Sequence, residues 1–307
     1  MERQRRWPSV IAIAALLSGV VLAYNAAGQT PYRVQTKTIS LGIVSEVNQK
    51  EIEEHYRDFV RYVALKLSSE GKVILASTPP ELAKLLEQQN VDFYMESAYS
   101  TYIINDVEGA AKLLLRRWQR GKPEYQSLIF TKRNSGVNRL DDLRGKIIIF
   151  ENLKSTSGYF LPKFFLQRNG FKLSEKSRLD AAVTPAEIGY IFASSQEQLV
   201  SLVLTNQAAG GAFSDDDYAK LDDKAKAEIG VLARTERLPR YLVSIRKDMP
   251  QALTDRLKAI LIAMSEDDEG RRILQKTGET TKFDMLPEGE EGMRRRLLET
   301  FLSPARK

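Results

Sequence analysis

Three hydroxyl residues and a glycine, Ser155, Thr156, Ser157 and Gly158, stand where a buried strand should turn into a helix. The apolar run at 146–150 before them is typical of a strand covered on both faces, and aromatic residues recur at helical spacing after them. The first turn of a helix carries backbone N–H groups without partners, and its dipole favours negative charge. Small side chains there let an anion approach those groups. The stretch therefore predicts either an ordinary N-cap or an anion-binding site.

Residue counts exclude most catalytic and metal chemistry. The chain has no cysteine, so it has no disulfide, thiolate metal site or cysteine nucleophile. Its single histidine, His55, lies between Glu54 and Arg57, which indicates a solvated helix flank. A histidine metal site or a Ser-His-Asp triad is hard to build from one histidine. No carboxylate pair stands out either, so we predict a protein that is not an enzyme, without catalytic residues, cofactor or metal.

Composition and charge indicate a globular protein with no affinity for nucleic acid. The chain has 307 residues, of which 43% are hydrophobic and 28% charged. Its net charge is +6, and without residues 1–28 it is +4, with 43 basic against 39 acidic residues. No basic patch is interleaved with aromatic residues. Nucleic acid is therefore not an expected partner.

The N-terminus has the pattern of an export signal. Arg3, Arg5 and Arg6 precede an apolar stretch at 10–23, and small residues at 26–28 offer a cleavage site. We expect residues 1–28 to be a signal peptide or, if they are not cleaved, a signal anchor that inserts residues 10–27 into the inner membrane. Either outcome places the folded part in the periplasm, outside the cytoplasm.

The first third of the chain alternates strands and helices. Strands are expected at 38–44, 73–76 and 91–95, with helices at 49–70 and from Pro79 onward. This order predicts an open, mostly parallel α/β sheet covered by helices on both faces. Ligands gather at the carboxyl ends of such strands. Ser45 and the residues from Glu96 to Tyr99 are therefore candidates for the rim of a site.

A second α/β unit is expected to begin near residue 132. It contains strands at 146–150 and 210–214 and a helix at 196–207, whereas strands at 231–233 and 241–245 are expected to return to the first unit. The tail, 250–303, reads as helical. We predict lobe 1 from residues 36–130 plus 233–307 and lobe 2 from 131–232. The three aspartates at 215–217 are expected to form a solvated helix start.

Three motifs resemble one family of transport proteins. They are YxSxIFxxxxSG from Tyr125, LDDLRGK from Leu140 and STSGYFLP from Ser155. Together they resemble the phosphonate/phosphate-type periplasmic binding proteins, which are the solute receptors of ABC importers. Weaker matches lie at 91–99, 206–214 and 282–284, and the resemblance covers roughly residues 38–300.

The resemblance implies a type II periplasmic binding protein fold, in which two α/β lobes close on a ligand in the cleft between them. It implies that the hydroxyls of Ser155, Thr156 and Ser157 and the N–H groups around Gly158 hold a phosphoryl oxyanion. Tyr99, with Tyr94 or Glu96, would face that anion from the other lobe. The alternative for Tyr94 and Tyr99 is that they are core aromatic residues.

Several positions depart from the family pattern. Gln196 stands where many relatives carry histidine, and Ala209 and Ser214 stand where they carry aspartate. Ser45 and Ala98 replace prolines. Ser45, Gln196 and Ser214 are therefore included as ligand-binding candidates with altered chemistry. A neutral amide can donate to phosphate but supplies no charge, so the resemblance implies a small oxyanion without identifying it.

These observations predict an exported solute-binding protein. It would capture phosphate, phosphite or a phosphonate by clamshell closure and deliver it to an ABC transporter permease. The alternative is a membrane-anchored receptor or accessory sensor of the same fold, with a different ligand and a membrane signalling partner.

Overall fold

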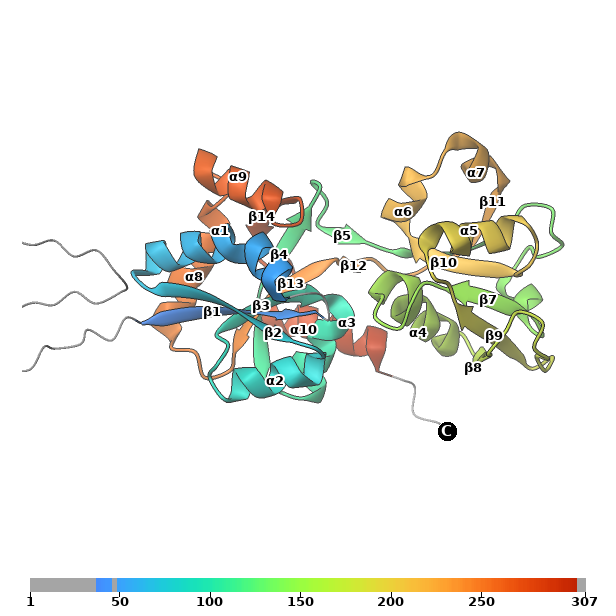
Figure 1. Ribbon diagram of the computed structural model, residues 1–307. Coiled ribbons are helices and arrows are strands. Elements are labelled where there is room, and N and C mark those ends of the chain that lie inside the picture. The colour runs from blue at the N-terminus through green and yellow to red at the C-terminus, as the bar shows by residue number, and fades with distance from the viewer. Residues whose placement is uncertain (1–36, 46–48, 303–307) are drawn as a thin grey trace, which may run out of the picture. The chain divides into compact units, whose positions relative to one another are not determined.

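The computed structural model describes residues 37–45 and 49–302 (Figure 1). The expected signal peptide or anchor at 1–28 lies outside these residues, so the membrane-anchored alternative stays a prediction. Within the described part of the chain, no helix combines the length and the apolar character needed to cross a membrane.

Six strands form the first sheet, in the order β14-β4-β13-β3-β1-β2. β1 pairs parallel with β2 and β3, whereas β3–β13, β13–β4 and β4–β14 are antiparallel. The expected mostly parallel sheet is therefore wrong here, because half of the sheet is built from strands outside the first strand–helix alternation. The strands are β1 (Thr38–Val44), β2 (Glu70–Ala76), β3 (Phe93–Ser97), β4 (Ala111–Gln119), β13 (Tyr241–Arg246) and β14 (Thr280–Asp284).

Helices cover both faces of the first sheet (Figure 1). They are α1 (Gln49–Leu67), α2 (Pro79–Glu87), α3 (Ala98–Tyr102), the π-helical turn η1 (Ile103–Val107), α8 (Gln251–Ala263), α9 (Asp268–Lys276) and α10 (Gly289–Phe301). The helix expected at 49–70 is confirmed as α1, and its Phe59, Val63 and Leu67 are buried in the core. The helix expected from Pro79 onward is also confirmed as α2, and the Thr78 hydroxyl caps it by accepting the Glu81 N–H at 3.3 Å. The expectation of an all-helical tail is wrong at β14.

The second sheet also has six strands, in the order β11-β6-β10-β7-β9-β8. β7 pairs parallel with β9 and β10, and β6 runs antiparallel to β10 and β11. The expectation that 231–233 returns to the first unit is wrong, because β11 pairs with β6. The strands are β6 (Ser127–Lys132), β7 (Ile147–Phe150), β8 (Lys172–Glu175), β9 (Glu187–Phe192), β10 (Gly210–Ser214) and β11 (Ile229–Arg234).

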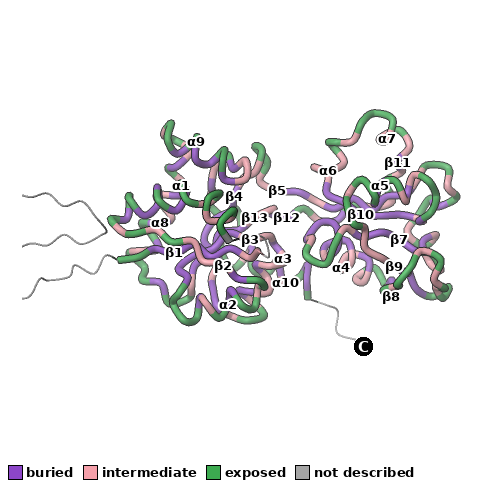
Figure 2. Tube along the Cα trace, in the orientation of Figure 1, coloured by how far each residue is buried: buried purple, intermediate pink, exposed green. Residues whose placement is uncertain are grey.

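Apolar strands of the second sheet lie between helices, so the core is buried and the helices face solvent (Figure 2). Phe130 of β6 stacks on Phe213 of β10 with ring centroids 4.1 Å apart. The surrounding helices are the 3₁₀ turn η2 (Leu140–Leu143), the π-helical turn η3 (Thr156–Phe160), α4 (Leu161–Arg168), α5 (Gln196–Leu204), α6 (Asp215–Lys220) and α7 (Asp223–Glu228).

The chain passes between the two sheets through a short antiparallel pair, β5 (Glu124–Tyr125) and β12 (Leu238–Pro239). Leu238 lies opposite Tyr125, and both side chains are buried. The expected lobe boundaries at 130/131 and 232/233 fall inside β6 and β11. The division into lobes stays a prediction, with the β5–β12 pair as the physical connection between them.

Candidate functional site

Ser155 is the N-cap of η3, directly after the loop that follows β7. Its hydroxyl accepts the Gly158 N–H at 2.9 Å and donates to the Glu151 carboxylate at 2.6 Å. Both of these bonds are internal to the loop and the turn. Ser155 therefore acts as an N-cap, and its hydroxyl hydrogen is donated to Glu151.

Gly158 is required by the close approach of Glu151. A Cβ atom added to Gly158 would lie 2.5 Å from the Cβ of Glu151 and 2.9 Å from the Ser155 hydroxyl, and would also meet the Glu151 carboxylate. No side chain fits at that distance. The glycine thus keeps the loop after β7 folded tightly against the first turn of η3.

Thr156 and Ser157 carry the hydroxyls that face away from this loop. Both residues are buried. The Thr156 hydroxyl donates to the hydroxyl of Ser97, the last residue of β3, at 3.0 Å, and the Ser157 carbonyl accepts the Ser127 hydroxyl at 2.6 Å. The start of η3 therefore lies against the carboxyl end of a strand of the first sheet, with N–H groups that precede its first intrahelical bond.

Tyr125 joins this cluster, although the sequence indicated it only as the first residue of the YxSxIFxxxxSG motif. Burial raises the pKa of its phenol, and nearby Tyr241 acts in the same direction. Arg240 and the hydroxyls of Thr156 and Ser157 act to lower the pKa of Tyr125. A phenol flanked by two hydroxyls at a helix start is a suitable donor for an oxyanion. Its place as the first residue of the YxS motif was the available sequence signal.

Glu96 lies one residue before the end of β3 and is partly buried. Its carboxylate accepts the Val44 N–H at 3.0 Å. Burial raises the pKa of the Glu96 carboxyl to about 7, against the opposing effects of the Val44 and Ser97 N–H groups and of Arg117. This side chain therefore changes charge near neutral pH at the same sheet edge as Ser97.

Arg117 is a buried cation on β4 that the sequence reasoning missed. Its guanidinium donates to the Thr280 hydroxyl at 2.6 Å and the Thr277 carbonyl at 3.0 Å, and it lies 4.5 Å from the ring centroid of Tyr241. Tyr241 is paired with Ser97 in the β3–β13 ladder. Arg117 thus supplies positive charge close behind the edge that carries Glu96 and Ser97.

Tyr99 and Tyr94 have different surroundings. Tyr99 stacks on Phe160 with centroids 3.4 Å apart and planes at 15°, and meets Phe301 edge-on at 5.3 Å. Tyr94 is fully buried, and its hydroxyl donates to Asn105 at 2.6 Å. The structure brings Tyr99 to η3 through Phe160, whereas Tyr94 lies in the core beneath the sheet edge.

The remaining predicted residues lie at element ends. Ser45 follows β1, and its N–H donates to the Ala76 carbonyl at 2.9 Å. Gln196 is the first residue of α5 and is partly exposed. Ser214 caps α6, since its hydroxyl accepts the Asp217 N–H at 3.1 Å and donates to the Asp217 carboxylate at 2.5 Å. The Ser214 hydroxyl is thus committed to its own helix.

The sequence predicted a solvated helix start at the aspartates of α6, and this prediction is wrong. Asp215 pairs with Arg237 at 3.0 Å, and Asp216 pairs with both Arg240 and Lys122 at 2.6 Å. The Asp215 and Asp216 side chains are only 18% and 14% exposed. They connect the second sheet to the strand pair β5–β12 and to the loop before it.

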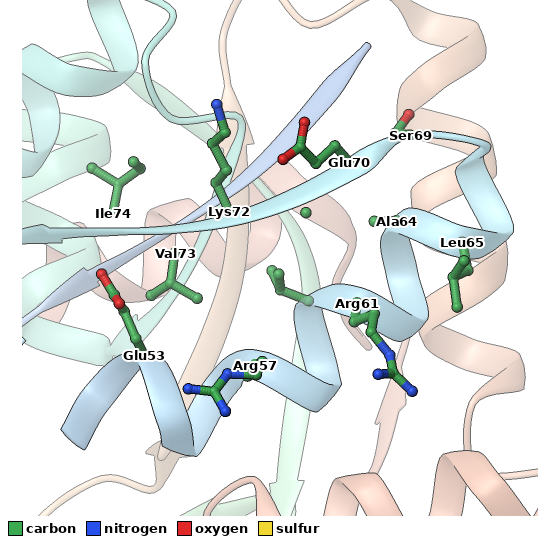
Figure 3. A pocket seen from close by; sticks show the side chains of 12 residues that line it. Glu53, Arg57, Arg61, Ala64, Leu65, Ser69, Glu70, Lys72, Val73 and Ile74 are labelled. Atoms are coloured by element: carbon green, nitrogen blue, oxygen red, sulfur yellow. The ribbon is translucent and has the colours of Figure 1, made fainter. Parts of the chain in front are cut away.

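A groove of about 690 Å³ between α1 and β2 is the main alternative location for a ligand. It is lined by residues of both charge signs, including Arg57, Arg61, Lys72, Glu53 and Glu70. Figure 3 shows the Lys72 ammonium pointing away from the guanidinium groups of Arg57 and Arg61. The cations do not converge, and the groove runs along a strand instead of lying at its carboxyl end, so we place the candidate site at η3.

The family model and the curated relatives that match this chain agree on one family. Residues 41–286 match the family model for the periplasmic substrate-binding protein of the phosphonate ABC transporter. A curated relative is the phosphate-import protein PhnD of Mycolicibacterium smegmatis. It is 24% identical over 227 residues, which are 72% of this chain and 69% of the relative.

Solved structures share the fold. XAC2383 from Xanthomonas citri, bound to ATP, has a TM-score of 0.75 at 24% identity and covers 87% of this chain and 97% of its own. PhnD1 from Prochlorococcus marinus, in complex with methylphosphonate, has a TM-score of 0.58 at 15% identity and covers 87% of this chain and 99% of its own. The predicted α/β fold of the two-lobe, type II periplasmic binding proteins is thereby confirmed.

Proposed function

The chain belongs to the family of periplasmic substrate-binding proteins of phosphonate ABC transporters, and we propose that it binds a phosphoryl-type oxyanion at Thr156 and Ser157. Membership makes it a solute-binding component of an importer, located outside the cytoplasm, and not an enzyme. The identity of the ligand, the residues that hold it and the closing motion are the proposal.

The contact between Thr156 and Ser97 carries this proposal. It places a hydroxyl at the start of η3 against the carboxyl end of β3, which is where open α/β sheets bind their ligands. An oxyanion at this point would meet the hydroxyls of Thr156 and Ser157 and the first N–H groups of η3. Tyr125 would add a phenolic donor from the connecting strand.

Ser155 and Gly158 have supporting roles in this site. Ser155 satisfies one N–H of the turn and is held by Glu151, while Gly158 permits that approach. They shape the turn and leave the Ser157 hydroxyl and the first N–H groups of η3 for the ligand, and the Thr156 hydroxyl would exchange its hydrogen bond to Ser97 for one to the anion. Of the predicted site residues, Tyr94 and Ser214 are left out, because their hydroxyls are committed within the core and within α6.

Closure follows from contacts that one ligand makes with both sheets. An oxyanion between η3 and the β3 edge would favour the arrangement in which Tyr99 stacks on Phe160, because that arrangement presents both sets of donors. The β5–β12 pair is the segment about which the lobes would move. The captured ligand would then be delivered to the permease of the importer.

The candidate ligands are phosphate, phosphite and phosphonates. The relatives carry different ligands in their names, including phosphate, methylphosphonate and ATP, so a test must cover small and large phosphoryl compounds. The positive charge of Arg117 behind the β3 edge attracts an anion. The Glu96 carboxylate repels an anion, and this repulsion is removed when the carboxyl is protonated.

Calorimetric titration tests this proposal with phosphate, phosphite, methylphosphonate, aminoethylphosphonate and ATP. The proposal predicts one-to-one binding of at least one of them. Thr156→Val should weaken that binding, and Thr254→Val is the matched control, since Thr254 lies buried on α8 among residues of the first sheet. Absence of binding for every compound, or equal binding by both variants, would contradict it.

A further inference from the structure

Arg240 lies one aromatic ring away from the proposed anion site. Its guanidinium carbon is 4.1 Å from the ring centroid of Tyr125, which is 3% exposed. Ser127, two residues after Tyr125, donates to the Ser157 carbonyl at 2.6 Å. The start of β6, two residues after Tyr125, is therefore bonded to the turn that carries the η3 hydroxyls.

Asp216 is the ion-pair partner of Arg240. An Arg240 Nη2 group donates to Asp216 Oδ2 at 2.6 Å, and the Lys122 ammonium donates to Oδ1 of the same carboxylate at 2.6 Å. The Arg240 and Asp216 side chains are 22% and 14% exposed. Burial acts to raise the pKa of Asp216, but hydrogen bonds from Lys122 and Arg240 hold it below its usual range. One ionised carboxylate is thus shared by two cations, the 51% exposed Lys122 and the mostly buried Arg240, so it does not fully compensate Arg240.

The neighbouring Arg237 differs in each of these respects. It forms a one-to-one pair with Asp215 at 3.0 Å, and its side chain is 47% exposed. Its charge is therefore compensated and screened by solvent. Two arginines of the same connecting segment thus differ in their electrostatic effect on the site.

A cation against the face of a phenol has two physical effects. It is attracted by the ring, which fixes the ring orientation. It also withdraws charge from the hydroxyl, which makes the O–H a stronger donor. In agreement, Arg240 acts to lower the pKa of Tyr125, opposing the larger effect of burial.

We propose that Arg240, fixed by Asp216, is a positioning residue of the anion site, which orients the Tyr125 hydroxyl toward the oxyanion and supplies positive charge to it. This inference rests on the proposed function. Many members of the family carry histidine at the position of Gln196, whose neutral amide supplies no charge. Arg240, which directly follows β12, would supply positive charge to the site instead.

The test compares Arg240→Gln, Arg240→Lys and Arg237→Gln by titration with inorganic phosphate at pH 8 over a series of salt concentrations. Arg240→Gln should weaken phosphate binding roughly tenfold and reduce its salt dependence. Arg240→Lys keeps the charge and should recover most of the affinity. Arg237→Gln removes the same charge from the same segment and should stay within about twofold of the parent, since its pair is exposed.

Thermal unfolding of each variant separates folding from binding. If Arg240→Gln does not fold, Lys122→Gln tests the same network, because it lets Asp216 compensate Arg240 fully and should weaken phosphate binding about threefold. Equal affinity of Arg240→Gln, Lys122→Gln and the parent overturns this inference and leaves the proposed function standing. A parent protein that binds no phosphoryl compound overturns both.

Discussion

The hydroxyl of Thr156 donates a 3.0 Å hydrogen bond to the hydroxyl of Ser97. One residue begins a helical turn beside the second sheet, and the other ends a strand of the first sheet, 59 residues earlier in the chain. Their contact places the donors of η3 at a strand end of the opposite sheet. The account of ligand binding depends on this relationship.

Removing the Thr156 hydroxyl should weaken binding of the anion. A hydrogen bond to a charged group is worth about 1.5–3 kcal/mol, or roughly 10- to 150-fold in affinity. Thr156→Val should show a loss in this range by calorimetry, and Thr156→Ser, which keeps the hydroxyl, should retain most of the affinity. Equal loss in both variants would contradict a specific role of the Thr156 hydroxyl.

Glu96 should make stability depend on pH between about 4.5 and 7. Burial raises the pKa of this carboxyl from its usual 4.5 to about 7, so the folded protein holds a proton that the unfolded chain releases in that window. The contribution of Glu96 to stability is therefore fully present below pH 4.5 and is lost as pH rises toward 7. Glu96→Gln keeps an acceptor for the Val44 N–H and cannot ionise.

Urea unfolding of both proteins measures this effect. Relative to the parent, Glu96→Gln should gain on the order of 3 kcal/mol in unfolding free energy between pH 4.5 and pH 7.5, with little further change above. A difference that does not vary with pH would show that the carboxyl has an ordinary pKa.

Gly158→Ala should destabilise the turn that shapes the site. The new Cβ would come within 2.5 Å of the Cβ of Glu151, so the loop or the turn must move at a cost of about 1–3 kcal/mol. Gly230→Ala is the matched control, because its Cβ would meet Thr131 at an ordinary 3.5 Å. In thermal unfolding, Gly158→Ala should melt at a lower temperature than the parent, whereas Gly230→Ala should not.

Stacking between Tyr99 and Phe160 should appear as an energetic coupling. Aromatic pairs contribute about 0.5–1.5 kcal/mol beyond their buried area. A double-mutant cycle with Tyr99→Leu and Phe160→Leu should give a coupling of that size in unfolding free energy. The cycle of Tyr99→Leu with Phe213→Leu, whose partner is Phe130 in the second core, should be additive. Additivity in both cycles would contradict the contact.

Local patterns predicted the part of the site that is continuous in sequence. The turn from β7 through Ser155 into η3 was found because an apolar run, a capping hydroxyl and a glycine follow each other. The start of α2 was also found from a local pattern, since the capping residue Thr78 directly precedes Pro79. In both places the partners that stabilise the structure are a few residues apart.

Contacts between distant segments were not predictable in this way. Arg117 is held by Thr280, which is 163 residues later, and Arg240 by Asp216 on α6. β4 was missed because two consecutive arginines interrupt its apolar pattern, and one of them, Arg116, is compensated by a pair with Asp284 across the sheet. A charged residue in the sequence gives no indication of whether a distant partner will bury it.

The most direct test of the central proposal is a crystal structure of the protein with the tightest-binding phosphoryl compound from the titrations. We expect the phosphoryl oxygens within hydrogen-bond distance of the Thr156 and Ser157 hydroxyls, with Tyr125 as a further donor. A phosphoryl group located elsewhere, for instance in the groove between α1 and β2, would contradict it.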